Sequence, residues 1–385
     1  MEKDAVGFES LYESHRKAEH GVIWKDSVAW FSLHGLEQCL KLSEELKNGT
    51  YKPKPPVAFT ITKPKKRDII AISYRDRVYQ RSINDNILYP IMTKSFVKEN
   101  GACQVGRGTE YCMNLFKKEL RRFYINHGRN GYFLQLDVKK YYPSMDHEVV
   151  KDLFRKKLMP ETYQAVADIL DFQYTGDVGY NPGSQMVQIA GISLLYGVDH
   201  FIKEKLHIKD YIRVMDDMVL IHEDKEYLEY CRKEITKELA KLKLTPHEDK
   251  TAIFPISKGI TFLGFTWRLT ETGKVIMTPK SQNIREFRYI LTKLMKMYAR
   301  GERTKRSIED SKRSRLDFIG KGNTYQLQKR LNKWYDERME YYEGKRQQFL
   351  QEEGTVPERE GRAGQPQSRE RTAQADNSDS GRCSH

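Results

Sequence analysis

The chain has 385 residues and a formal net charge of +14, with 67 Lys and Arg residues against 53 Asp and Glu residues. This length supports two or three subdomains around a substantial core, and the excess positive charge suits a polyanionic partner such as nucleic acid. Five cysteines without a C-x-x-C pair argue against a zinc site or a disulfide framework, and no apolar run approaches the ~18 residues of a membrane span. Because the N-terminus also lacks an apolar segment, we expect a cytoplasmic protein without a membrane partner.

The first 130 residues predict helices interrupted by one pair of short strands. Leu33, Leu36 and Leu40 recur at helical spacing within a helical region over 8–48, and Gly49 follows as a stop signal. The other elements expected here are strands at 57–62 and 68–72, joined by a basic turn, and helices at 76–96 and 109–126.

From residue 132 onward, strand and helix patterns alternate. A strand at 132–138 places Asp137 on the face opposite Leu134 and Leu136. The elements expected after it are helices at 147–172, 186–206 and 224–242, short strands around 251–268, and helices over 283–348. This last region is strongly basic, with 20 Lys and Arg against 9 Asp and Glu over 274–346. After about 351 the chain has almost no large apolar residues, which predicts a disordered tail.

Two adjacent aspartates, Asp216 and Asp217, interrupt an apolar run from Tyr211 to His222. The flanking residues are β-branched, aromatic or otherwise apolar, which predicts a strand, a turn and a second strand. Two like charges on a rigid turn repel each other, and a divalent cation such as Mg²⁺ is the usual compensation because it prefers hard oxygen ligands. Since Asp is also a good turn residue, the pair alone leaves both interpretations open.

A third carboxylate makes the metal interpretation more specific. Asp137 ends an alternating strand, and the two helices that follow allow the chain to return and lay the Asp216-Asp217 hairpin beside it. Carboxylates so placed could bridge two metals about 3.5–4 Å apart, the arrangement used for in-line displacement at phosphorus. A lone Asp after a strand is more often a cap or turn residue. Asp137 therefore indicates a metal site only in combination with Asp216 and Asp217.

The order of motifs resembles that of reverse transcriptases. The segment from Asp137 to Tyr142 resembles their first catalytic motif, and Val214-Met-Asp216-Asp217 resembles their Tyr-x-Asp-Asp hairpin. Further segments resemble motifs of group II intron and related bacterial enzymes, in matching order: 61–67, 74–80, 100–109, 182–188, 248–251 and 262–265. The resemblance covers roughly residues 20–345.

The resemblance implies an α+β right-hand polymerase fold, with an antiparallel palm sheet, fingers and a helical thumb. The implied divisions are an N-terminal helical extension (1–50), fingers (51–130), palm (131–268), helical thumb (269–348) and a disordered tail (349–385).

The resemblance also implies which residues hold the metals. Asp137, Asp216 and Asp217 are the implied catalytic residues, and Val138 joins them in the implied metal-binding set. The implied cofactor is a pair of Mg²⁺ ions, with Mn²⁺ as a substitute.

Five residues are implied in nucleotide binding. Lys63 and Arg67 would meet the triphosphate, where the planar guanidinium suits bidentate phosphate contact, although both could belong to a solvated turn. Tyr142 would exclude a 2′-hydroxyl, although an isolated aromatic is more often a core residue. Gln188 would touch the template or nucleotide, and Lys250 is a candidate general acid for pyrophosphate departure, or else a surface lysine.

Three residues are implied in contacts with template and primer, namely Arg77, Gly183 and Gly264. Two departures from the family pattern point to a variant enzyme. Val214 replaces the Tyr that usually precedes x-Asp-Asp, and Val187 replaces a usual Ser in a loop whose final Gln is typical of diversity-generating retroelements. No endonuclease or RNase H module is expected.

The function expected from these motifs is RNA-directed DNA synthesis, with an RNA template, a DNA or RNA primer and dNTPs as partners. A dedicated non-coding RNA or a small accessory protein is a further candidate partner. The biological setting stays open between a diversity-generating retroelement, an antiviral defence enzyme (including a protein-primed or untemplated one) and an orphan intron-derived enzyme. The alternative is a non-catalytic, maturase-like RNA-binding protein, which would have no need for the three aspartates together.

Overall fold

The computed structural model describes residues 4–62, 67–181 and 183–354. The chain forms two compact units. The first comprises residues up to Ile284 together with Gly320–Thr324, and the second comprises Arg285–Ile319 together with the residues from Tyr325 onward. None of the helices in the described ranges combines the length and apolar character needed to span a bilayer.

The N-terminal region is helical, as predicted, but it is divided into three helices: α1 (Phe8–Glu19), α2 (Asp26–Leu33) and α3 (Gly35–Lys47). The first break lies near Gly21, whose φ of +75° is unfavourable for other residues. The helix α1 packs against α3 and against α4 (Tyr74–Ile83), and its residue Leu11 is completely buried.

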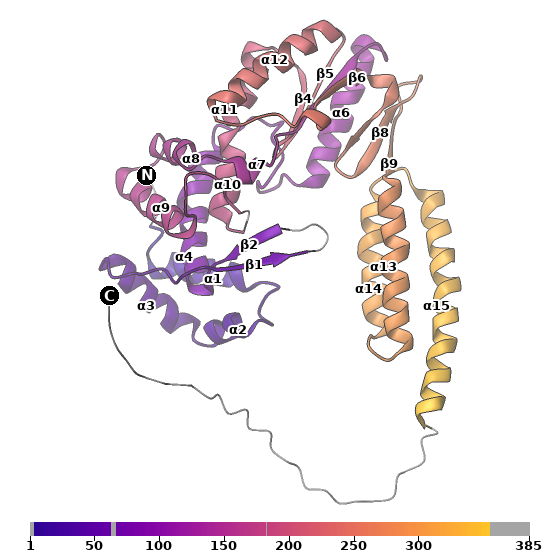
Figure 1. Ribbon diagram of the computed structural model, residues 1–385, viewed down its shortest axis with the longest axis horizontal. Helices are drawn as coiled ribbons and strands as arrows, with labels where there is room; N and C mark the ends of the chain where they lie inside the picture. The colour runs from indigo at the N-terminus through magenta and orange to yellow at the C-terminus, as the bar shows by residue number, and fades with distance from the viewer. Residues whose placement is uncertain (1–3, 63–66, 182, 355–385) are drawn as a thin grey trace, which may run out of the picture. The chain divides into compact units, whose positions relative to one another are not determined.

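An antiparallel hairpin of two strands, β1 (Val57–Ile61) and β2 (Arg67–Ala71), follows this region (Figure 1). The helix predicted over 76–96 consists of three consecutive segments: α4 (Tyr74–Ile83), a π-helical segment η1 (Asn84–Leu88) and α5 (Tyr89–Thr93). Single π-helical turns are rare and occur frequently at functional sites.

The central sheet has four antiparallel strands in the order β4-β5-β3-β6. Their bounds are β3 (Tyr132–Leu136), β4 (Asp210–Val214), β5 (Asp217–His222) and β6 (Ala252–Pro255). Both faces of the sheet are covered. The helix α12 (Lys225–Lys241) contacts β3, β5 and β6, and α6 (Thr109–His127) contacts β4 (Figure 1).

Strand β3 therefore differs in one respect from its predicted alternation. Leu134 and Leu136 belong to the core on one face, as expected. Phe133, on the opposite face, is also buried, because Phe116 of α6 packs 6.4 Å from it between ring centroids. Only the end of that face, at Gln135 and Asp137, is polar.

Short helices connect these strands. They are α7 (Tyr141–Ser144), α8 (His147–Arg155), α9 (Pro160–Gln173), α10 (Gln185–Leu194), α11 (Tyr196–His200) and a second π-helical segment η2 (Phe201–Lys205). Two 3₁₀ turns flank β6, namely η3 (Glu248–Lys250) and η4 (Ile256–Lys258).

A second antiparallel sheet contains β7 (Ile260–Phe262), β8 (Phe265–Leu269) and β9 (Val275–Pro279). The turn between β7 and β8 consists of Leu263 and Gly264, both with positive φ, as a tight two-residue hairpin turn requires. The strand β9 lies within 269–348, where the sequence predicted a helical thumb, so helical structure begins only at Ser281.

The second unit is built from α13 (Ser281–Ala299), most of which lies in this unit, α14 (Lys305–Gly320) and α15 (Tyr325–Gly354). Its buried apolar residues include Phe287, Leu291, Met295, Ile308, Ile319, Leu331 and Met339. The helix α15 continues to Gly354, so the prediction of disorder was wrong for 349–354. The rest of the predicted tail, 355–385, lies outside the described residues.

The predicted fold class is confirmed: the chain is α+β, with antiparallel sheets and a separate basic helical segment. The division into fingers, palm and thumb stays a prediction.

Candidate active site

Asp216 and Asp217 lie at the tip of the β4–β5 hairpin, as predicted. Val214 pairs with Asp217 across the two strands, so Met215 and Asp216 form a two-residue turn. Met215 adopts a left-handed conformation with φ of +58°, and the strand residues that follow the turn, from Met218 to Ile221, are buried. A rigid buried hairpin therefore fixes the backbone of the carboxylate pair.

The pairing of β3 with β5 brings Asp137 to the same edge. Leu136 pairs with Met218, and the next step of this antiparallel register places Asp137 opposite Asp217. Residues opposite each other in antiparallel strands project from the same face. Gln135 supports this arrangement from β3, with its Nε2 atom 3.4 Å from Asp217 Oδ1 and 3.3 Å from the Thr261 carbonyl oxygen.

Burial and mutual repulsion disfavour the charged forms of the carboxylates at the hairpin tip. Burial raises the pKa of Asp217 to about 7, and the charges of Asp137 and Asp216 add to this rise. Burial also raises the pKa of Asp216, with a further contribution from Asp137. Carboxylates that disfavour one another in this way are stabilised by a cation.

Lys250 supplies one such positive charge. Its Nζ atom lies 2.9 and 3.0 Å from the two carboxylate oxygens of Asp137. The 3₁₀ turn that carries Lys250 is fixed to β3, because the His247 amide donates to the Asp137 carbonyl over 2.7 Å. The lysine side chain remains more than half exposed. The structure thus brings this predicted residue into direct contact with the carboxylate cluster.

Hard carboxylate oxygens are the donors that Mg²⁺ prefers, so the chemistry of the three aspartates fits this ion. Within the described residues, however, no three His, Cys, Asp or Glu side chains are grouped closely enough to hold a metal ion. Asp137 contacts the ammonium group of Lys250 instead. The Val138 side chain is apolar and buried, so only its backbone carbonyl could serve as a ligand.

Tyr142 lies near this cluster, at the start of α7. Its ring packs against Gly191 of α10, where a Cβ atom would come within 3.1 Å of the tyrosine hydroxyl. That hydroxyl is buried and has no hydrogen-bond partner. Tyr142 therefore packs closely against Gly191, where a side chain on α10 would crowd the ring.

Gln188 and Gly183 belong to the loop and helix that face the β1–β2 hairpin. The Ser184 side chain caps α10 by accepting from the Val187 amide, and Gln188 lies one turn into the helix. A Cβ atom at Gly183 would be 3.3 Å from the Ile70 carbonyl oxygen of β2. The loop therefore approaches β2, the strand that begins with Arg67.

The remaining candidate site residues lie on separate elements. Lys63 lies outside the described residues, and Arg67, whose side chain is not described, pairs with Ile61 at the end of the β1–β2 hairpin. Arg77 is half-buried on α4. Gly264, with φ of +83°, occupies the β7–β8 turn, where its carbonyl accepts from Asn283 Nδ2 over 3.2 Å.

One important residue was missed in the sequence, namely Arg213. It is completely buried and donates to both carboxylate oxygens of Asp199, over 2.7 and 2.5 Å. Its Nη1 atom also donates to the Met215 carbonyl over 2.8 Å, directly behind the aspartate turn. The available signal was an arginine inside an otherwise apolar strand, since a fully buried charge is almost always paired.

The chain was compared with known proteins. No curated protein matches it. Telomerase from Candida albicans, solved with a fragment of telomeric RNA, is 12% identical, with a TM-score of 0.44 over 70% of this chain and 54% of that one. An apo telomerase from Candida tropicalis is 14% identical, with a TM-score of 0.44 over 63% of this chain and 60% of that one. The chain thus spans less than two thirds of either telomerase chain.

The family comparison is more informative. Residues 52–267 match the model of the family described as reverse transcriptase (RNA-dependent DNA polymerase). This span contains the Asp216-Asp217 hairpin, Asp137 and Lys250. Because it also exceeds half of the chain, the protein belongs to the reverse transcriptase family.

Proposed function

We propose that this protein is an RNA-directed DNA polymerase that extends a primer 3′-hydroxyl with dNTPs. The observation that carries the proposal is the convergence of Asp137, Asp216 and Asp217 at one edge of a buried sheet, in a chain of the reverse transcriptase family. Two Mg²⁺ ions, or Mn²⁺ as a substitute, would activate the 3′-hydroxyl and neutralise charge on the transferring phosphoryl group when bound there.

The other residues near the cluster have roles that follow from their positions. Tyr142 presents a ring that packs against Gly191, which suits the exclusion of a ribose 2′-hydroxyl. Lys250 holds a proton beside Asp137, which suits a general acid. The basic helices α13–α15 suit a grip on the template–primer backbone by charge and shape, as is typical of RNA duplex recognition.

We further propose a cytoplasmic setting in a bacterial retroelement or phage-defence system, with a dedicated non-coding RNA or a small accessory protein as partner. The reducing setting is supported by Cys39, Cys103, Cys112 and Cys231, which are free thiols. The retroelement is supported by the sequence pattern around Gln188.

The test is primer extension on a defined RNA template with Mg²⁺ and all four dNTPs, followed by sequencing of the product. We expect DNA complementary to the template from the wild-type protein, and a rate at least ~10³-fold lower from Asp137→Asn, because charge stabilisation is usually the largest catalytic effect. Asp224→Asn is the matched control, since Asp224 caps α12 at the far end of β5 and Asn caps equally well. Template-independent product, or equal rates in all three proteins, would refute the proposal.

A further inference from the structure

Three leucines whose spacing predicted a helix, Leu33, Leu36 and Leu40, lie on the protein surface and not in the core. Each of them is more than half exposed, and so is Trp30, three residues before the first leucine. They belong to α2 and α3, which follow each other with only His34 between them (Figure 1). These four apolar residues are called the α2–α3 patch below.

The residues of the α2–α3 patch share one side of the two helices. The steps between them are three, three and four residues, which is the spacing of neighbours on one helix face. The His34 amide donates to carbonyl oxygens of α2, and the His34 carbonyl accepts from the Gln38 amide, so helical hydrogen bonds continue across the junction. The buried residues of the other side are Val28, Phe31, Cys39 and Leu42. A contiguous exposed apolar surface of this kind marks an interaction site.

The charge of these two helices disfavours a nucleic-acid partner for the patch. Residues 26–47 contain four Asp and Glu against two Lys, although the whole chain has a net charge of +14. Nucleic acids and anionic membrane surfaces are attracted by clusters of Lys and Arg. The α2–α3 patch therefore suits another protein surface.

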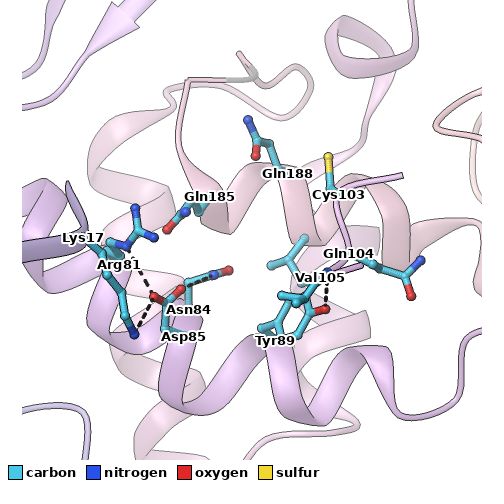
Figure 2. Close-up of a pocket in the computed structure, with 11 residues that line it drawn as sticks. Lys17, Arg81, Asn84, Asp85, Tyr89, Cys103, Gln104, Val105, Gln185 and Gln188 are labelled. Carbon is cyan, nitrogen blue, oxygen red and sulfur yellow. Dashed lines mark hydrogen bonds and ion pairs between the residues drawn. The ribbon is translucent and has the colours of Figure 1, made fainter. Parts of the chain in front are cut away.

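The patch is separate from the cavity beside the proposed active site. Figure 2 shows this cavity, which has a volume of about 530 Å³. It adjoins the aspartate turn, because Cys103 lines it and the sulfur of Cys103 lies 3.9 Å from that of Met215. Among the described residues, its walls come from α1, α4, η1, α5, α10 and the segment around Gln104, and α2 and α3 contribute none. A protein bound at the patch therefore need not cover this cavity.

The surface of α3 is complementary to itself in an antiparallel arrangement. Leu36 and Leu40 form its apolar stripe. Glu37 and Lys41 are exposed, and each follows one of these leucines, so both charges lie on the same flank of the stripe. If two copies of α3 pack about a two-fold axis near Gln38, Leu36 meets Leu40 of the partner subunit. The same axis brings Glu37 to Lys41 of the partner subunit, and each contact occurs twice.

We propose that the α2–α3 patch is the contact surface of a homodimer, in which α3 packs antiparallel against α3 of a second copy of this chain. The charges of Glu37 and Lys41 set the register, and Trp30 and Leu33 of α2 enlarge the apolar area. The inference goes beyond the proposed polymerase activity and does not depend on it.

The experiment measures the oligomeric state of the nuclease-treated, full-length protein by sedimentation velocity over a series of concentrations. We expect the wild type to shift from monomer to dimer as the concentration rises. Leu36→Ser/Leu40→Ser should stay monomeric where the wild type is dimeric, with an unfolding midpoint in urea close to that of the wild type, because both side chains are exposed. Ile125→Ser on α6 is the matched control, since this side chain is 80% exposed outside the patch, and it should dimerise like the wild type.

The two charges test the register. Glu37→Lys should weaken the dimer by at least about 10-fold, because two cations then face each other at two symmetric positions. Glu37→Lys/Lys41→Glu exchanges the two charges, so it should restore the dimer dissociation constant to within about 3-fold of the wild-type value.

A wild-type protein that is monomeric at every concentration would overturn the inference and assign the patch to a different protein. Dimers of Leu36→Ser/Leu40→Ser at wild-type concentrations would also overturn it, because the contact would then lie elsewhere. A folded charge-exchange variant that stays monomeric would contradict the antiparallel register. Primer extension is measured in parallel. A dimer without extension refutes the proposed polymerase activity alone, and extension by a strictly monomeric protein refutes this inference alone.

Discussion

Substitutions in the buried ion pair behind the aspartate turn, Arg213 and Asp199, should change stability and activity to different extents. Asp199 is completely buried and accepts from Arg213 and from the Tyr211 hydroxyl. Arg213→Met leaves this carboxylate without its cation, so we expect the free energy of unfolding to fall by about 3–5 kcal/mol. The second substitution, Asp199→Asn, removes the buried charge and keeps an acceptor for Tyr211, so most of this loss should be recovered.

Activity should not recover in the double variant. The Met215 carbonyl still lacks its guanidinium donor, and a hydrogen bond to a charged group contributes about 1.5–3 kcal/mol. If this energy holds the aspartate turn in its reactive geometry, kcat on a primed RNA falls by about 10- to 150-fold. Urea unfolding and primer extension measure the two quantities separately.

The matched control is the exposed pair of Arg232 and Glu229 on α12, whose side chains are each 42% exposed. Arg232→Met/Glu229→Gln should change stability by less than about 1 kcal/mol and leave kcat unchanged. A variant Arg213→Met/Asp199→Asn with recovered stability and wild-type kcat would refute the positioning role of Arg213.

Three further predictions follow from individual side chains. Burial raises the pKa of Glu119 to about 7, so its folded form holds a proton that the unfolded chain loses above about pH 4.5. Wild-type stability should therefore fall as pH rises from 5 to 8, while urea unfolding of Glu119→Gln should show a smaller fall; equal falls would contradict this. Tyr142→Phe removes a buried unpaired hydroxyl but keeps the ring, so unfolding should show unchanged or higher stability and extension assays should show retained rejection of rNTPs. A loss above about 1 kcal/mol would argue that the hydroxyl is paired. Lys250→Met removes the ammonium group that pairs with Asp137, so Mg²⁺ no longer competes with it for this carboxylate. The Mg²⁺ concentration for half-maximal extension should therefore fall, and an unchanged or higher concentration would contradict this prediction.

The aspartate hairpin could be predicted because its signal is local. Apolar strand residues flank Asp216 and Asp217 on both sides, and the alternation before Asp137 identifies the end of a neighbouring strand. The contact of Lys250 with Asp137 could not be predicted, because it depends on how the chain returns 113 residues later. The same holds for Arg213, whose partner Asp199 lies on a different element.

Other differences in the fold arise from local signals that were present but weak. Gly21 interrupts the first helical region, although the apolar spacing continues across it. The strand β9 has only five residues, 275–279, which is too few to show a clear alternation of buried and exposed residues. It follows a turn at Gly273, whose φ is +76°. The π-helical segment at Asn84 has no recognisable sequence signal.

The most direct test of the central claim is the rate of Mg²⁺-dependent dNTP incorporation on a primed RNA by wild type and by Asp216→Ala/Asp217→Ala. Both substitutions lie at the hairpin tip, so RNA binding and stability are measured in parallel to confirm that the variant is folded. We predict incorporation by the wild-type protein and none above background by the folded variant. Incorporation by the variant at the wild-type rate would contradict the assignment of these carboxylates to catalysis.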